Sequence, residues 1–107
     1  VASNRIGTEE VLSQKVKTDI LDTGRGKIEL LYSTELDSAI NKFINKSGVG
    51  IHHLALLVDD IQAALKHLNK QGVKIINKKP SVGAEGYKIA FIHPKSTGGI
   101  LVELCEK

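Results

Sequence analysis

The sequence predicts an α+β fold of paired βαβββ modules, the first of which lacks its opening strand and helix. Three observations lead to this prediction. Several short segments alternate apolar and polar residues, as half-buried strands do, whereas two longer segments repeat apolar residues at helical spacing. From residue 50 onward the expected order is β-α-β-β-β. Residues 1–33 end in strands that resemble those ending the second half, so we interpret them as a partial second copy.

The partial first module is expected to contain three strands. The first lies within residues 5–12. The next two, residues 15–22 and 27–33, are separated by the segment TGRG at 23–26, whose glycines suit a hairpin turn. The second and third strands are therefore expected to form a hairpin.

Residues 34–49 are expected to form a helix that links the two modules. Its apolar residues recur at i, i+3, i+4, i+7 and i+8, and they are Leu36, Ala39, Ile40, Phe43 and Ile44. Thr34 is the expected N-cap, with Asp37 three residues later, and Gly48 is the expected C-terminal cap.

Residues 50–107 are expected to form the complete second module. The predicted strands are residues 50–58, 73–76, 87–92 and 100–105, and the predicted loops are residues 80–86 and 93–99. The predicted helix begins after Asp59 or Asp60 and ends at Gly72. Its apolar face consists of Ile61, Ala64, Leu65 and Leu68.

Composition favours one soluble globular domain. The 107 residues suffice for one compact core, and the 41% hydrophobic and 25% charged fractions are ordinary. The net charge is +3, and the charged residues form no run of five or six like charges, so nucleic-acid binding has little support. A weak positive field favours an anionic small molecule.

No membrane or export segment is predicted. The longest uninterrupted apolar stretch, residues 54–58, is far too short to span a bilayer, and no signal peptide opens the chain. The single cysteine, Cys105, excludes an intramolecular disulfide framework and suits a reducing compartment. The expected location is the cytoplasm, or the mitochondrial matrix in a eukaryote.

Three side chains on the predicted strands could carry chemistry. Alternation places His53 on one face with Ala55, and it places Glu103 opposite the apolar row Ile100, Val102 and Leu104. Glu29 likewise lies opposite the row Ile28, Leu30 and Tyr32. We expect both apolar rows to pack against helices, which leaves each glutamate on a face that could form a pocket.

A carboxylate bordered by leucines is costly to bury alone, so it should be paired, hydrogen-bonded, protonated or bound to a metal. One imidazole and two carboxylates, from His53, Glu29 and Glu103, suit Mn, Co, Ni, Fe or Zn with positions open to substrate. The alternative is a solvated or salt-bridged role for each glutamate and a packing role for His53. His52 is expected to face outward or to pack, and His67 to lie on the surface.

The loop at 93–99, HPKSTGG, has two interpretations. Lys95 and the backbone N–H groups of the glycines could hold a phosphate or carboxylate. Alternatively, the proline and glycines serve only the geometry of a hairpin connection. The turn is favoured for the glycines, and the role of Lys95 stays open.

The segment GIHHLALLVDDIQAA at 50–64 resembles the methylmalonyl-CoA epimerases of the vicinal-oxygen-chelate superfamily. The resemblance continues through GAEG at 83–86 and HPKSTGGILVELCE at 93–106, and it covers nearly the whole chain. It implies paired βαβββ modules of the vicinal-oxygen-chelate type. It also implies a metal-dependent epimerase that interconverts (R)- and (S)-methylmalonyl-CoA by removing and returning the α-proton.

The resemblance also implies roles for single residues. His53 and Glu29 correspond to metal ligands, and Glu103 corresponds to a ligand that also acts as the proton-transfer base. The family's remaining histidine ligand has no counterpart in this sequence. A second catalytic glutamate of some members would fall near Thr18, which cannot move protons in that role.

The implied cofactor is a divalent metal (Co, Mn, Ni or Zn), and the implied partner is an acyl-CoA whose phosphates Lys95 and Ser96 could contact. A homodimer is expected, without nucleic-acid or membrane partners. Three alternatives stay open. They are a glyoxalase I-like isomerase, which the HPKSTGG loop disfavours, a metal-free small-molecule-binding module, and a remnant without activity.

Overall fold

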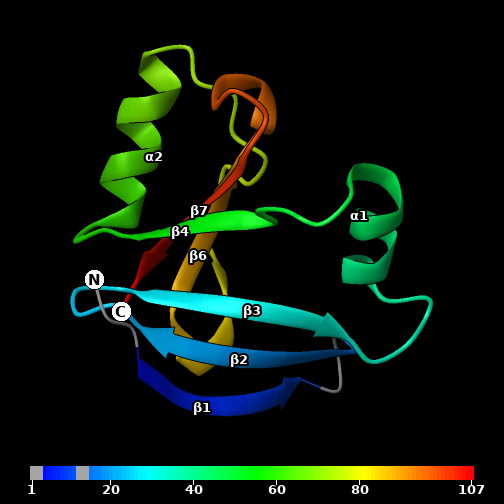
Figure 1. The fold of residues 1–107 in the computed structure, drawn as a ribbon. Coiled ribbons are helices and arrows are strands. Elements are labelled where there is room, and N and C mark those ends of the chain that lie inside the picture. Colours follow the sequence, from blue (N-terminus) through cyan, green and yellow to red (C-terminus); the bar gives the residue numbers. More distant parts are fainter. Residues whose placement is uncertain (1–3, 12–14) are drawn as a thin grey trace. The chain divides into compact units, whose positions relative to one another are not determined.

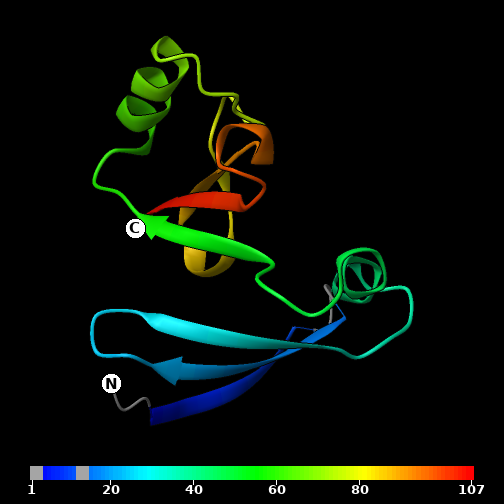
Figure 2. The same cartoon turned by 45° about the horizontal axis from the view of Figure 1, so that its top comes forward.

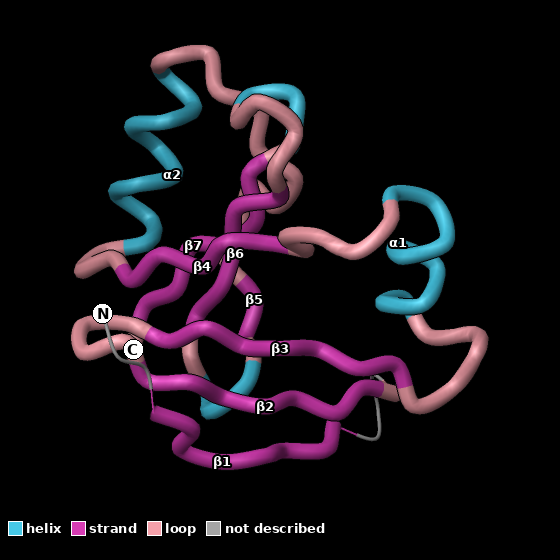
Figure 3. The backbone as a smooth tube through the Cα atoms, in the orientation of Figure 1, coloured by secondary structure: helices cyan, strands magenta, loops and turns pink. Residues whose placement is uncertain are grey.

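The computed structural model describes residues 4–11 and 15–107, which form an α+β fold (Figure 1). The chain divides into two compact units, Val1–Gly50 and Ile51–Lys107, called unit 1 and unit 2 below. Unit 1 contains β1 (Asn4–Val11), β2 (Val16–Asp22), β3 (Lys27–Ser33) and α1 (Ala39–Ser47). Unit 2 contains β4 (His53–Leu57), α2 (Ile61–Lys70), β5 (Ser81–Val82), η2 (Ala84–Gly86), β6 (Lys88–Ile92), η3 (Pro94–Ser96) and β7 (Leu101–Glu106). Figure 3 separates these helices and strands from the loops.

Unit 1 is built on an antiparallel sheet in the order β1-β2-β3. The backbone N–H of Thr23 donates to the carbonyl of Gly26 at 3.0 Å, which closes the turn between β2 and β3. Gly24 has a φ of +100°, a conformation that glycine adopts without the steric cost of a side chain. The three predicted strands and their hairpin turn are therefore confirmed.

Helix α1 begins later than predicted. Its N-cap is Ser38, whose hydroxyl accepts the N–H of Asn41 at 3.0 Å, and its C-cap is Gly48 as expected. The prediction of Thr34 as N-cap is wrong, because the helix starts after Ser38, and the backbone N–H of Thr34 instead donates to the carbonyl of Lys15 at 2.9 Å. This bond extends the pairing of the β2–β3 hairpin and delays the helix.

The apolar row of β3 is not packed against a helix, contrary to expectation. Ile28, Leu30 and Tyr32 are between 45 and 52% exposed. In β2 and β3, whose side chains the structure describes, the buried residues are instead Val16 and Thr18, which the β2–β3 register places on the face that carries Glu29. α1, the one helix in the described part of unit 1, contacts β3 but leaves this row exposed, and its own buried residue is Ile40.

Unit 2 has a four-stranded sheet in the order β4-β7-β6-β5. β4 and β7 are parallel, whereas β7–β6 and β6–β5 are antiparallel. α2 follows β4 and packs along one side of this sheet (Figures 1 and 2). The core lies between them and consists of Ile61, Leu65, Ala90, Ile92, Val102 and Leu104. The prediction that the apolar row of the last strand packs against a helix is confirmed for Val102 and Leu104.

The N-terminus of α2 is fixed by two carboxylates. Asp60 is the N-cap, and its Oδ1 accepts the N–H of Ala63 at 3.1 Å. Glu106, the last residue of β7, accepts the N–H of Ile61 at 2.9 Å through Oε1. These bonds satisfy helix N–H groups that have no partner within the helix, and they join α2 to β7.

None of the described helices is long and apolar enough to span a membrane.

The predicted strand over residues 73–76 is absent, and the two-residue strand β5 lies where a loop was predicted. Residues 74–76 do lie beside β6, but they form a single isolated bridge, Ile75 with Ile92. The ladder stops because the side chain of Asn77 accepts the N–H of Phe91 at 2.9 Å and replaces a backbone partner.

Candidate functional site

His53 and Glu103 come together on one face of the unit 2 sheet. The parallel register pairs His53 with Leu101 and Ala55 with Glu103, so the two side chains are diagonal neighbours. His53 Nε2 lies 3.5 Å from Glu103 Oε1, and the side chains are 29% and 16% exposed, respectively. Because Val102 and Leu104 pack into the core beneath α2, the alternation of β7 turns this pair to the opposite face.

The ring of His52 contacts the ring of His53. The two Nδ1 atoms are 2.9 Å apart and the rings meet edge to face at 84°. A hydrogen bond between them needs one proton, so one ring donates and the other accepts. Burial, together with the neighbouring His53, lowers the pKa of His52, which favours its neutral form. When His53 donates, its Nε2 presents an unprotonated lone pair beside Glu103.

Strand alternation predicts that the side chain of His52 faces away from the site, so its contact with His53 was not predicted. His52 precedes β4, so its position depends on the local backbone rather than on the strand period. The adjacent HH pair in the sequence was the one signal that could have indicated it.

Cys105 is a further member of this face. It lies opposite Leu57 in the β4–β7 register, two residues after Glu103. Burial raises the pKa of the Cys105 thiol, and the charge of Glu103 and a hydrogen bond with it act in the same direction. The thiol is therefore protonated near neutral pH. In the sequence, this lone cysteine indicates only a reducing compartment.

Glu29, the third predicted ligand, belongs to unit 1. It is an exposed residue of β3, opposite Ile20 of β2. Thr18 is buried on the same face of this hairpin. Among the described residues, no group of three or more His, Cys, Asp or Glu side chains could hold a metal ion. The three-ligand set therefore stays a prediction, of which the structure brings together His53 and Glu103.

The loop at 93–99 is organised by its own hydrogen bonds. His93 Nδ1 accepts the N–H of Lys95 at 3.0 Å, and the hydroxyl of Ser96 accepts the N–H of Lys74 at 2.8 Å. Gly98 and Gly99 have φ angles of +73° and +99°. The turn interpretation of these glycines is confirmed, whereas the exposed side chain of Lys95 stays available for a ligand.

Comparison with known families gives a match over residues 4–91 to the Glyoxalase/Bleomycin resistance protein/Dioxygenase superfamily. The chain belongs to this superfamily. Membership agrees with the α+β fold and with the resemblance noted in the sequence, since the vicinal-oxygen-chelate enzymes and glyoxalases share this fold.

Individual members of the superfamily are also similar. The mitochondrial methylmalonyl-CoA epimerase of Dictyostelium discoideum is 49% identical over 82 residues, which cover 76% of this chain and 49% of that protein. A solved structure of a hypothetical protein from Bacillus halodurans is 44% identical, with a TM-score of 0.85, covering 98% of this chain and 76% of that one.

A methylmalonyl-CoA epimerase solved in complex with methylmalonyl-CoA and NH4+ is 33% identical, with a TM-score of 0.73, covering 98% of this chain and 77% of that one. The chain spans about half the length of the curated eukaryotic epimerases that it matches.

Proposed function

We propose that this chain carries the proton-transfer site of a methylmalonyl-CoA epimerase. The observation that supports the proposal is the pair His53 and Glu103, with Nε2 and Oε1 at 3.5 Å on a sheet face that α2 does not cover. The similarity to named epimerases, one of them solved with methylmalonyl-CoA, supports the choice of substrate.

Epimerisation requires that a proton leave the carbon between a thioester and a carboxylate and return on the other side. Glu103 is suited to take that proton, because its carboxylate is largely buried, at 16% exposure, in a central strand of the sheet. Its neighbours across the strands are the apolar Ala55 and Phe91, and its hydrogen-bond partner on the same face is the Cys105 thiol. A positioned carboxylate of this kind contributes about 10²- to 10⁴-fold to the rate of proton transfer.

The donor atoms of His53 and Glu103 fit a divalent metal. Their separation of 3.5 Å is less than twice a typical ligand bond of about 2.1 Å, so both atoms can bind one ion. Imidazole and carboxylate suit Co, Mn, Ni or Zn, and Glu29 is proposed as the third ligand. A bound divalent ion supplies positive charge that stabilises the enolate oxygen as it develops.

The chain's own residues prepare this pair for its role. His52 orients the imidazole of His53, and when His53 donates their hydrogen bond its Nε2 is left without a proton. Lys95 and Ser96 are proposed to contact the phosphates of the CoA group. The Ser96 hydroxyl accepts the N–H of Lys74 and so keeps its own O–H free to donate to a phosphate oxygen.

The test is proton exchange at the α-carbon. Methylmalonyl-CoA is incubated with the protein and Co²⁺ in D₂O, and deuterium incorporation is followed by mass spectrometry. Glu103→Gln is expected to slow incorporation by at least about 100-fold, since an amide cannot accept the proton. Undiminished incorporation by Glu103→Gln would remove Glu103 from the reaction. Turnover of the methylglyoxal–glutathione hemithioacetal instead would favour a glyoxalase I-like activity.

A further inference from the structure

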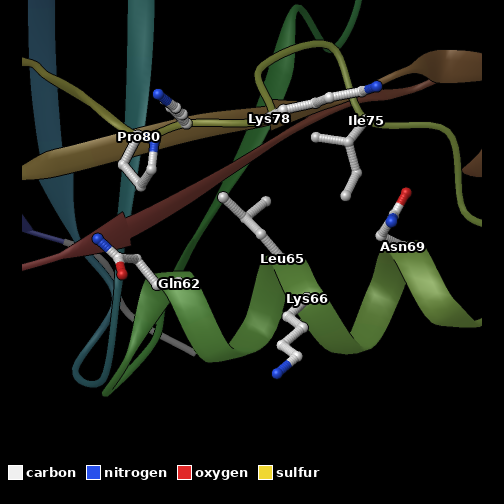
Figure 4. Close-up of a pocket in the computed structure, with 8 residues that line it drawn as sticks. Gln62, Leu65, Lys66, Asn69, Ile75, Lys78 and Pro80 are labelled. Carbon is white, nitrogen blue, oxygen red and sulfur yellow. The ribbon is translucent and has the colours of Figure 1, made fainter.

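A second concave site lies between α2 and the segment that follows it. The cleft has a volume of about 520 Å³ and is lined by Gln62, Leu65, Lys66, Asn69, Ile75, Lys78, Lys79 and Pro80 (Figure 4). It lies on the α2 side of the unit 2 sheet, whereas His53 and Glu103 lie on the other face. This cleft, called the α2 cleft below, is therefore separate from the proposed proton-transfer site.

The inner wall of the α2 cleft is apolar and its ends are polar. Figure 4 shows Leu65 of α2 and Ile75 of the facing segment directed toward one another across the space. Gln62 and Asn69 lie one turn before and one turn after Leu65, so an amide flanks the apolar wall at each end. The side chain of Lys66 points away from the cleft. Such a wall suits a flat apolar group with a few hydrogen-bonding atoms at its edge.

The surroundings of the α2 cleft are strongly basic. Residues 61–84 contain no Asp or Glu, and they contain the five lysines Lys66, Lys70, Lys74, Lys78 and Lys79. Among the side chains that the structure describes, the ion pairs involve Lys15, His53 and Lys88 and none of these five. A concave surface lined by lysines outside these ion pairs attracts anions, and Lys78 and Lys79 both line it.

We propose that the α2 cleft binds a nucleoside phosphate. The phosphate meets the ammonium groups of Lys78 and Lys79, the base packs on the partly exposed Ile75 and Pro80, and the amides of Gln62 and Asn69 hydrogen-bond its edge. The volume falls within the range of about 300–1,000 Å³ that is usual for small-molecule sites. The proposal does not depend on the epimerase activity.

The test is a titration of the ¹⁵N-labelled protein with adenosine 3′,5′-bisphosphate, followed by NMR. Shifts are expected at the residues that line the α2 cleft. The double variant K78Q/K79Q should weaken binding at least tenfold. The matched control K42Q/K46Q, which removes two exposed lysines of α1, should change the affinity by less than twofold. Absent shifts, or equal losses in the two double variants, would overturn the proposal.

Two further arms complete the test. Pyrophosphate, which has no base, should bind at least tenfold more weakly than the bisphosphate, and equal affinity would refute the role of the apolar wall. Glu103→Gln should leave bisphosphate binding unchanged, which separates this site from the proposed function. An increased KM of K78Q/K79Q for methylmalonyl-CoA would identify the nucleotide end of CoA as the source. An unchanged KM would identify a free nucleotide.

Discussion

Two glutamates on β7 provide the sharpest contrast between a catalytic and a structural carboxylate. Glu103 and Glu106 are three residues apart and similarly shielded, at 16% and 19% exposure. Because their separation is odd, they lie on opposite faces of the strand. Glu103 faces His53, whereas Glu106 accepts the N–H of Ile61 at the start of α2 and lies 3.6 Å from Lys88. The same change, Glu to Gln, should therefore have opposite effects at the two positions.

The expected magnitudes follow from these contacts. Glu106→Gln keeps an oxygen for the N–H of Ile61 but removes the negative charge beside the helix N-terminus, which contributes about 0.3–1 kcal/mol. The weaker neutral hydrogen bond adds to this loss, for a total of about 1–2 kcal/mol. The ion pair with Lys88 adds little, because the lysine is 53% exposed. Glu103→Gln should cost less than about 1 kcal/mol, since its amide keeps an oxygen for the hydrogen bond with the Cys105 thiol.

The assay combines urea unfolding, followed by circular dichroism, with deuterium incorporation into methylmalonyl-CoA. Glu106→Gln should lower the free energy of unfolding and leave the rate of incorporation within about threefold of the unchanged protein. Glu103→Gln should slow incorporation at least about 100-fold with a smaller loss of stability than Glu106→Gln. If Glu106→Gln slows the reaction as much as Glu103→Gln, or if Glu103→Gln is the more destabilising, the assignment of the two faces is wrong.

Three further predictions follow from other contacts. His52→Ala should weaken Co²⁺ binding about 10- to 100-fold, measured by absorption spectroscopy, because His53 loses its orienting hydrogen bond. His52→Asn should restore part of the Co²⁺ affinity, and equal affinity in all three proteins would contradict this role of His52. Leu65→Ala should lower the free energy of unfolding by about 2–5 kcal/mol in urea titrations, since the Leu65 side chain is 4% exposed and packs in the core. A loss below about 1 kcal/mol would argue against that packing. Because the pKa of Cys105 is raised, a smaller fraction of this thiol is ionised at pH 8 than of a free thiol. Iodoacetamide should therefore alkylate Cys105 more slowly than it alkylates the thiol of glutathione, and equal rates would refute the raised pKa.

Strand periodicity accounts for the part of the site that could be predicted from the sequence. Successive residues of a strand face opposite sides, so the buried Val102 and Leu104 require Glu103 to face away from α2. The same reasoning failed for β3, where Ile28 and Leu30 are exposed. The alternation was correct there, but a sequence pattern does not show which face of a sheet a helix covers.

Features that depend on single hydrogen bonds could not be predicted. Thr34 and Asp37 have the spacing of a capping pair, yet the bond from Thr34 to Lys15 moves the cap to Ser38. The two-residue strand β5 is too short to show any periodicity.

The central claim is that His53 and Glu103 bind one metal ion, with Glu103 as the base beside it. The most direct measurement is a crystal structure of the Co²⁺-loaded protein with anomalous diffraction at the cobalt edge. We expect a single peak within about 2.3 Å of His53 Nε2 and of a carboxylate oxygen of Glu103, with Glu29 as a third ligand. A cobalt ion bound elsewhere, or contacting neither His53 nor Glu103, would contradict the account.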